Sequence, residues 1–152
     1  MRPANRPTSD SLPDLSCALA SLRRATRVVT QLYQEEMRKH GLDGSTHFTI
    51  LHVLATGESL NQGDLATALA ADSTTLSRTL RLMERNGWIR IRPGRNDKRE
   101  RRINLTAAGR RQLEKSRPDW ERAQTRLREA LGDDWESLAR LLQRVAEAGR
   151  TA

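Results

Sequence analysis

The sequence is poor in the residues that define several protein classes. Its single cysteine, Cys17, excludes an intramolecular disulfide scaffold. Only five of the 152 residues are aromatic, and valine and isoleucine together number eight, against 21 leucines and 17 alanines. This balance favours helices over a β-sandwich or β-barrel, because β-branched and aromatic residues are the ones enriched in strands. We therefore expect a mainly α-helical protein.

Long apolar segments are also missing. No apolar run approaches the roughly 18–20 residues that a membrane-spanning helix needs. The first residues, MRPANRPTSDSLPD, contain no apolar stretch of the signal-peptide type. The sequence therefore predicts a cytoplasmic protein without a membrane partner.

Signatures of catalysis and of metal binding are absent as well. The sequence has no glycine-rich phosphate loop, no activated-serine motif and no paired carboxylates in an apolar setting. The three histidines, His40, His47 and His52, have no cysteine or carboxylate at metal-ligand spacing. We interpret His47 and His52 as packing or pocket-lining groups, and we expect no enzyme, no metal and no cofactor.

The net charge of +8 is concentrated in one segment. Residues 78–111 hold 12 basic and 3 acidic residues, a net charge of +9, so the remaining residues sum to −1. A positive field this local suits a polyanion, and double-stranded DNA is the first candidate. An anionic membrane surface and a merely solvated arginine face are the alternatives.

Helical periodicity at both ends of the chain predicts two long helical segments. Residues 1–11 have the composition of a disordered tail, and residues 12–43 contain one long helix that starts near Pro13. Residues 111–150 continue a helical pattern in which Pro118 should kink or split the helix. Because both segments carry apolar stripes that one small globule cannot cover, we expect the ends of two chains to pair in a homodimer.

The central residues 45–110 combine helical and alternating patterns. Three short helices precede a two-stranded hairpin, and Thr106 caps the helix that follows. The helices are expected over residues 45–56, after the N-cap Asn61, and from Asp72 or Ser73 to Asn86; the strands are expected at 88–92 and 101–105. This order predicts a winged helix-turn-helix domain with a small β-hairpin wing, flanked by the two dimerisation segments.

The last of these helices has two chemically distinct faces. Thr74, Arg78, Arg81 and Arg85 share one face, opposite an apolar stripe that includes Leu76. An α-helix fits the major groove, where arginine commonly reads guanine, and Ser or Thr in the first turn can bind phosphates or bases. The alternative is an exposed arginine stripe in which Ser and Thr serve only as caps.

The expected tip of the wing is strongly basic. It carries Arg95, Lys98 and Arg99 around a turn that also holds Asn96 and Asp97. A wing of this kind can place arginine in the minor groove, where the negative potential is focused. Asp97 can hold the Arg99 guanidinium in one orientation, and the alternative is an ordinary turn-forming aspartate.

These motifs resemble the MarR family of bacterial winged helix-turn-helix transcriptional regulators. The resemblance rests on the segments DSTTLSR at 72–78, LMERNGWI at 82–89, DKR at 97–99 and LTAAG at 105–109. It implies a homodimeric repressor on a pseudo-palindromic operator, released by a small phenolic or other aromatic ligand or by oxidation. It also implies the DNA-binding residues, namely Ser73, Thr74, Thr75, Ser77, Arg78, Arg81, Arg95, Asp97, Lys98 and Arg99. The alternative is an architectural DNA-coating protein without signal input.

The resemblance also implies two candidate signal sites. One branch of the family senses hydroperoxides through a lone cysteine near the start of its first helix, which corresponds to Cys17 here. Alternatively, Cys17 is a small apolar residue packed at the dimer interface. Related proteins form a ligand pocket between the first, second and fifth helices, and Tyr33, His47 and Leu51 are the candidate pocket residues.

Overall fold

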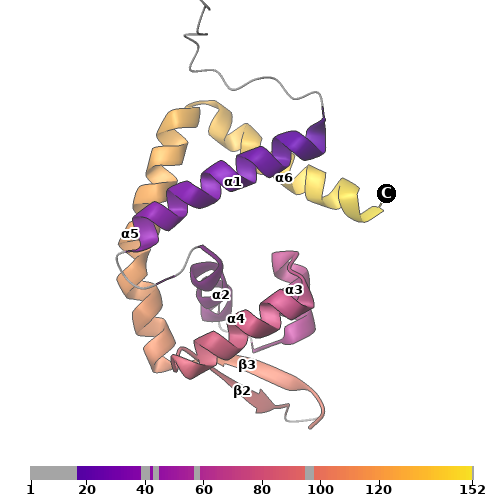
Figure 1. Cartoon of the computed structure of the whole chain (residues 1–152), viewed down its shortest axis with the longest axis vertical. Coiled ribbons are helices and arrows are strands. Elements are labelled where there is room, and N and C mark those ends of the chain that lie inside the picture. Colours follow the sequence, from indigo (N-terminus) through magenta and orange to yellow (C-terminus); the bar gives the residue numbers. More distant parts are fainter. Residues whose placement is uncertain (1–16, 39–41, 43–44, 57–58, 95–97, 152) are drawn as a thin grey trace, which may run out of the picture.

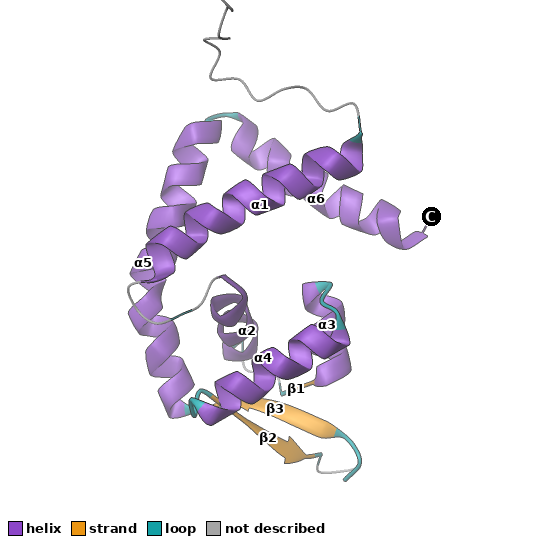
Figure 2. Ribbon diagram, viewed as in Figure 1, coloured by secondary structure: helices purple, strands orange, loops and turns teal. Residues whose placement is uncertain are grey.

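The computed structural model of this chain describes residues 17–38, 42, 45–56, 59–94 and 98–151. Helices dominate it, and one small sheet lies at the end of the molecule opposite the crossing of the terminal helices (Figures 1 and 2). The elements are α1 (Ala18–Met37), α2 (Ser45–Ala55), β1 (Leu60–Asn61), α3 (Gln62–Leu69), α4 (Ser73–Arg85), β2 (Ile89–Pro93), β3 (Arg101–Leu105), α5 (Ala107–Leu131) and α6 (Asp134–Thr151). The expected fold class, mainly α with a small β wing, is confirmed.

Three helix starts follow the capping chemistry of the sequence. The side chain of Asn61 accepts a hydrogen bond from the Asp64 backbone N–H at 2.8 Å. Thr106 caps α5 in the same way by accepting from the backbone N–H of Gly109. Asp72 caps α4 and is considered below with the interface. Each cap satisfies a backbone donor that a helix start leaves without an intrahelical partner.

The sheet has one more strand than the expected hairpin. Its antiparallel order is β1-β3-β2, with Leu60 opposite Ile103 and Ile91 opposite Ile103 on the other side. β1 is only two residues long, so it carries no alternation that a periodicity argument can detect. Its pairing makes β3 the central strand of the sheet and leaves β2 at an edge.

The core lies between α2, α3, α4, the inner face of the sheet and the first half of α5. It contains side chains that are at most 4% exposed, among them Phe48, Leu51, Leu54, Leu65, Leu76, Leu80, Met83, Ile89, Ile103 and Leu113. Trp120 of α5 stacks on Phe48 with ring centroids 5.4 Å apart. Trp120 is therefore partly buried against the core of its own chain.

The predicted start of the first helix, Pro13, lies outside the described residues; α1 begins at Ala18, after the extended backbone of Cys17 (φ −91°, ψ 114°). One helix prediction needs correction. The fifth helix is not split at Pro118 but runs unbroken for 25 residues. Proline removes one intrahelical hydrogen bond. Buried side chains on both sides of it, including Leu113 and Ala123, hold α5 against α1 and α2 and keep the helix in one piece.

The relation of the long helices is plain in Figure 1. α5 runs along one side of the molecule, from the sheet to the far end where α1 and α6 cross. α1 packs on α5, and Glu36 of α1 accepts hydrogen bonds from Arg122 at 3.2 Å and from Arg126 at 2.8 Å. These two arginines lower the pKa of the Glu36 carboxyl. None of the helices in the described part of the chain is long and apolar enough to cross a membrane.

Candidate nucleic-acid interface

Helix α4 separates its apolar and basic residues as the sequence predicts. Leu76, Leu80 and Met83 are buried in the core. The opposite face carries Thr74, Arg78, Arg81 and Arg85, and all four are exposed. The Asp72 carboxylate accepts a hydrogen bond from the Thr75 backbone N–H at 2.8 Å, which also lowers its pKa. The basic face of α4 is therefore presented to solvent on a helix anchored by its cap and its core.

Among the Ser and Thr residues at the start of α4, Ser77 differs from the others. Ser73, Thr74 and Thr75 are exposed, whereas Ser77 is half-buried. Gln62 of α3 donates from Nε2 to Ser77 Oγ at 2.6 Å, and Ser77 Oγ donates to the Ser73 carbonyl at 2.8 Å. The Ser77 hydroxyl therefore holds α4 against α3. Sequence reasoning missed Gln62, which follows the Asn61 cap and gives no periodic signal of its own.

A carboxylate on α4 also holds the wing. Glu84 Oε1 accepts a hydrogen bond from the Ile91 backbone N–H of β2 at 2.9 Å. β2 is an edge strand, so a backbone N–H on its outer side has no neighbouring strand to bind. Glu84 satisfies that donor and fixes the wing relative to α4. As one of three acids in the basic segment, Glu84 was visible in the sequence, but its partner is backbone and leaves no sequence signal.

The described part of the wing closes through backbone and side-chain contacts. The Gly94 N–H donates to the Glu100 carbonyl at 2.8 Å. Lys98 and Arg99 are exposed at the tip. Arg95 and Asp97 lie outside the described residues, so the predicted Asp97–Arg99 pair remains a prediction.

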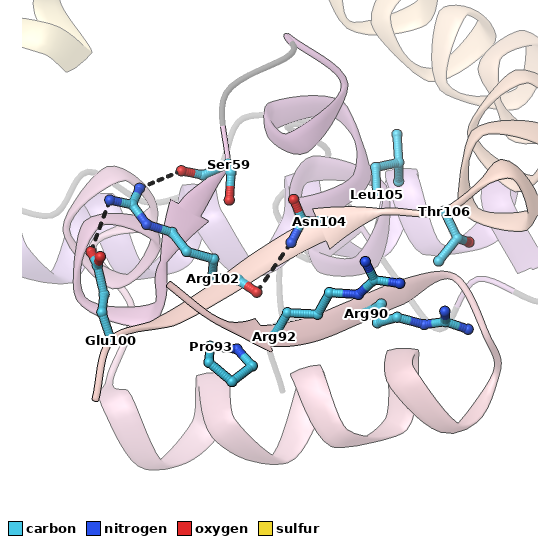
Figure 3. Close-up of a pocket in the computed structure, with 9 residues that line it drawn as sticks. All are labelled: Ser59, Arg90, Arg92, Pro93, Glu100, Arg102, Asn104, Leu105 and Thr106. Atoms are coloured by element: carbon cyan, nitrogen blue, oxygen red, sulfur yellow. Dashed lines mark hydrogen bonds and ion pairs between the residues drawn. The ribbon is translucent and has the colours of Figure 1, made fainter. Parts of the chain in front are cut away.

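The base of the wing is braced by Arg102. Its guanidinium donates to the Ser59 carbonyl at 2.7 Å and pairs with Glu100 Oε1 at 2.9 Å, as Figure 3 shows. Asn61 Nδ2 donates to the same Glu100 oxygen at 3.3 Å. These contacts link β1, β3 and the turn into one unit, so the orientation of the wing is determined by its own chain.

The LTAAG segment at 105–109 joins the wing to α5. Thr106 donates from Oγ1 to the Gly87 carbonyl at 2.6 Å, and its N–H donates to the Trp88 carbonyl at 3.0 Å. Gly109 is buried so close to this turn that a Cβ atom would lie 2.0 Å from the Trp88 carbonyl oxygen. No other residue fits there without moving the backbone. The motif therefore has a structural role, because it forms the junction between α4, the wing and α5.

The candidate ligand residues are not brought together. Tyr33 lines a groove of about 360 Å³ between α1, α5 and α6, and its hydroxyl donates to Gln124 Oε1 at 2.6 Å. Partial burial raises the pKa of the Tyr33 hydroxyl. Leu51 is fully buried in the core, and His47 is buried with its ring edge-on to Trp88. Neither residue lines this groove.

The candidate redox residue, Cys17, is the single cysteine of the sequence. It is exposed at the N-cap position of α1. Within the described residues, no group of three or more His, Cys, Asp or Glu side chains is placed to hold a metal ion.

Comparison with known proteins agrees with this architecture. The sequence profile of the MarR family matches residues 40–100. The crystal structure of the M. tuberculosis transcriptional regulator MosR in complex with DNA is 34% identical, with a TM-score of 0.80, over 90% of this chain and 98% of that one. The transcriptional repressor CouR, bound to a 23-mer DNA duplex, is 24% identical over 90% of this chain and 99% of that one, and its TM-score of 0.78 shows the same fold.

A relative in Bacillus subtilis points the same way. The HTH-type transcriptional regulator YwoH is 29% identical over 85 residues, which is 56% of this chain and 61% of that protein. These relatives are regulators of transcription, so the expectation that the chain is not an enzyme is confirmed. On the evidence of the MosR identity over nearly the whole of both chains, together with the profile match, this chain belongs to the MarR family of transcriptional regulators.

Proposed function

We propose that this regulator is a sequence-specific, homodimeric repressor that acts in the cytoplasm on a pseudo-palindromic DNA operator. The observation that carries the proposal is the exposed arginine face of α4 beside a basic wing whose orientation is held by Glu84 and Arg102. A recognition helix and a wing in fixed relation can contact the major groove and the neighbouring minor groove together. The DNA in the MosR complex supports this reading.

The contacts divide into two roles. Arg78 and Arg81 project from the exposed face of α4 and are proposed to read base edges. Ser73, Thr74 and Thr75, at the helix start, are proposed to bind phosphates and orient the helix. The wing residues Arg95, Lys98 and Arg99, with Asp97 orienting Arg99, are proposed to enter the minor groove. Ser77 supports this surface from within, because its hydroxyl is bound to Gln62.

The dimer would be built from the terminal helices. Large apolar side chains on α1 and α6 are about half exposed in the single chain, namely Leu19 (57%), Val28 (51%), Leu141 (53%), Leu142 (48%) and Val145 (46%). A second chain would remove these side chains from water, and exposed apolar surface often marks a protein–protein interface. In this proposal, residues 12–43 and 111–150 form the dimer and residues 45–110 bind DNA.

Two signals are proposed for release of the operator. An aromatic ligand suits the groove at Tyr33, because the groove is apolar along α6 and offers the Tyr33 and Gln124 polar atoms at one end. Oxidation of the exposed Cys17 is the second route. The deciding measurement is operator affinity of wild type and of Cys17→Ser, with and without mild peroxide and with and without phenolic acids. Release of wild type but not of Cys17→Ser by peroxide supports oxidation of Cys17. Release of both proteins by phenolic acids, with no effect of peroxide, supports the groove.

The experiment that tests the function is selection of bound duplexes from random DNA, followed by footprinting on the intergenic DNA beside the gene. We expect a two-fold symmetric site with half-sites about one helical turn apart. Affinity should fall by on the order of 10³–10⁵ between roughly 50 and 200 mM salt if about 6–10 phosphates are contacted. Binding without any preferred sequence would contradict the proposal and favour the architectural alternative.

A further inference from the structure

The outer face of the wing sheet carries a basic groove apart from the recognition helix. Side chains alternate along the strands, so Ile89, Ile91 and Ile103 face the core. The other face bears the cross-strand pairs Arg90–Asn104 and Arg92–Arg102. These side chains line a groove of about 910 Å³, shown in Figure 3. The outer face is therefore a continuous surface built by the register of β2 and β3.

The arginines of this groove are not equivalent. Arg102 is already engaged, by Glu100 at 2.9 Å and by the Ser59 carbonyl at 2.7 Å. Arg90 and Arg92 are exposed and form no ion pair with any residue in the described part of the chain. They are two residues apart on one strand, which separates their Cα atoms by about 6.8 Å. The groove thus offers two adjacent guanidinium groups that the described carboxylates leave available to an external anion.

Phosphate is the anion that this arrangement suits. A guanidinium group binds phosphate oxygens through two parallel N–H donors, and it is weakly hydrated compared with an ammonium group. Asn104, opposite Arg90, adds a polar side chain to the same groove. Glu100, the carboxylate in the groove lining, is held by Arg102 and so repels an incoming anion less than a lone carboxylate would.

The groove is formed by strands and is distinct from the recognition face of α4. Helices α2 and α3 pack against β3, whereas α4 runs beside the free edge of β2, where Glu84 accepts the Ile91 N–H (Figure 3). Because Arg90 and Arg92 belong to β2, a phosphate that reaches them lies to the side of the base pairs that α4 contacts. The groove is open along the strands, and this shape fits an extended backbone better than a small molecule that a pocket must enclose.

We propose that the outer face of the wing sheet is a second phosphate-binding site, in which Arg90 and Arg92 bind the backbone of DNA beyond the base pairs contacted by α4. This proposal rests on the proposed DNA-binding function. It assigns to β2 a contact that lengthens the DNA footprint on the side of the wing without reading sequence.

The test compares two duplexes and two charge-matched variants of the full chain. One duplex carries only the selected operator, and the other carries the same operator extended by about 10 base pairs, one helical turn, on each side. The groove variant is Arg90→Gln/Arg92→Gln. The control variant is Arg2→Gln/Arg6→Gln, which removes the same charge outside the segments proposed to bind DNA or form the dimer.

We expect wild type and the control variant to bind the long duplex more tightly than the short one. The groove variant should lose this gain while keeping its affinity for the short duplex. Its salt slope on the long duplex should fall by about 1.8 per bound chain, because each lost phosphate contact removes about 0.9. Affinity for the short duplex is kept because the lost contacts lie outside the operator.

A second arm tests whether the phosphate comes from a free ligand. Tripolyphosphate is titrated into each protein without DNA and followed by calorimetry. Binding that Arg90→Gln/Arg92→Gln abolishes, with no effect of duplex length, would retain the phosphate site and overturn its assignment to DNA. If neither duplex length nor tripolyphosphate distinguishes the groove variant from the control, the proposed phosphate site is wrong. The proposed function is tested separately, by wild type and the short duplex: specific binding supports it, and absence of specific binding contradicts it.

Discussion

The winged segment and the terminal helices solve the problem of burying apolar surface in opposite ways. In the winged segment, Leu65, Leu76 and Ile103 are at most 2% exposed. In α6, no side chain of residues 134–150 is fully buried, and Leu141 and Val145 are about half exposed. The first region completes its core within one chain. The second presents an apolar face that its own chain leaves uncovered.

The difference shows how one short chain can combine a rigid winged segment with a surface available for assembly. Hydrogen bonds donated by Gln62 and Thr106 and accepted by Glu84 tie the winged elements to one another. Contacts between the terminal helices include the Tyr33–Gln124 hydrogen bond and the ion pairs of Glu36 with two arginines of α5. A partner or ligand that changes the terminal helices can therefore move the winged segment as a unit, because its internal contacts hold it together.

The sharpest test of the comparison is Leu141→Glu in α6. If this face is buried by a second chain, each lost apolar side chain costs about 1.5–3 kcal/mol and is lost twice per dimer. The dimer dissociation constant should therefore rise by on the order of 10²–10⁴. Sedimentation equilibrium measures it, with Gln143→Glu as the control because it adds the same charge at another exposed position of the helix. Equal dimerisation of both variants would show that α6 is not the interface.

The winged segment is expected to be intolerant of added volume at its junction. In Gly109→Val, the new Cβ meets the Trp88 backbone and the Leu105 side chain, so the turn must open. We expect a loss of about 3 kcal/mol or more in the free energy of unfolding, measured by urea denaturation. Gly149→Val is the control, since a Cβ atom there meets nothing within 4 Å. Similar stability of the two variants would refute the close approach at Gly109.

Within the winged segment, substitutions in α4 and in the wing should affect DNA binding differently. Arg78→Ala should relax base preference at one position of each half-site and cost roughly 1–3 kcal/mol. Arg99→Ala should weaken binding to most sequences alike, because a wing arginine in the minor groove senses groove shape and potential. Affinities for the selected site and for single-base variants of it measure both effects. Uniform weakening by Arg78→Ala would argue against base reading by this residue.

The smallest expected effect concerns the contact between α1 and α5. Arg126 and Arg122 lower the pKa of Glu36 in the folded chain, so its ion pairs stabilise the fold above the pKa of the unfolded carboxyl. That contribution is lost as the pH falls through the lowered folded pKa. Because both arginines are about half exposed, we expect less than about 1 kcal/mol at neutral pH.

The comparison variant for this contact is Glu36→Gln. Its free energy of unfolding should be lower than that of wild type at pH 7, and the two should converge in acid. Urea denaturation at several pH values measures the difference. A difference that is constant with pH would mean that the charge of Glu36 does not contribute.

Local chemistry in the sequence was enough to predict much of the winged segment. Asn61 and Thr106 are caps in the structure because their short polar side chains satisfy the first backbone donors of the helices that follow. The two faces of α4 follow from helical spacing alone, since Leu76 and Arg78 are separated by about 200° around the axis. Alternation likewise predicted the two longer strands of the wing.

Contacts between distant residues were decided only by the tertiary structure. The pairing of Leu60–Asn61 with β3, the hydrogen bond from Ile91 N–H to Glu84 and the stacking of Trp120 on Phe48 leave no pattern in the local sequence. The same is true of the placement of Tyr33 apart from His47 and Leu51. Periodicity specifies which face of an element is apolar, but not which neighbour covers it. That choice depends on the packing of the whole chain, and packing also keeps α5 intact at Pro118, where local propensity alone predicts a break.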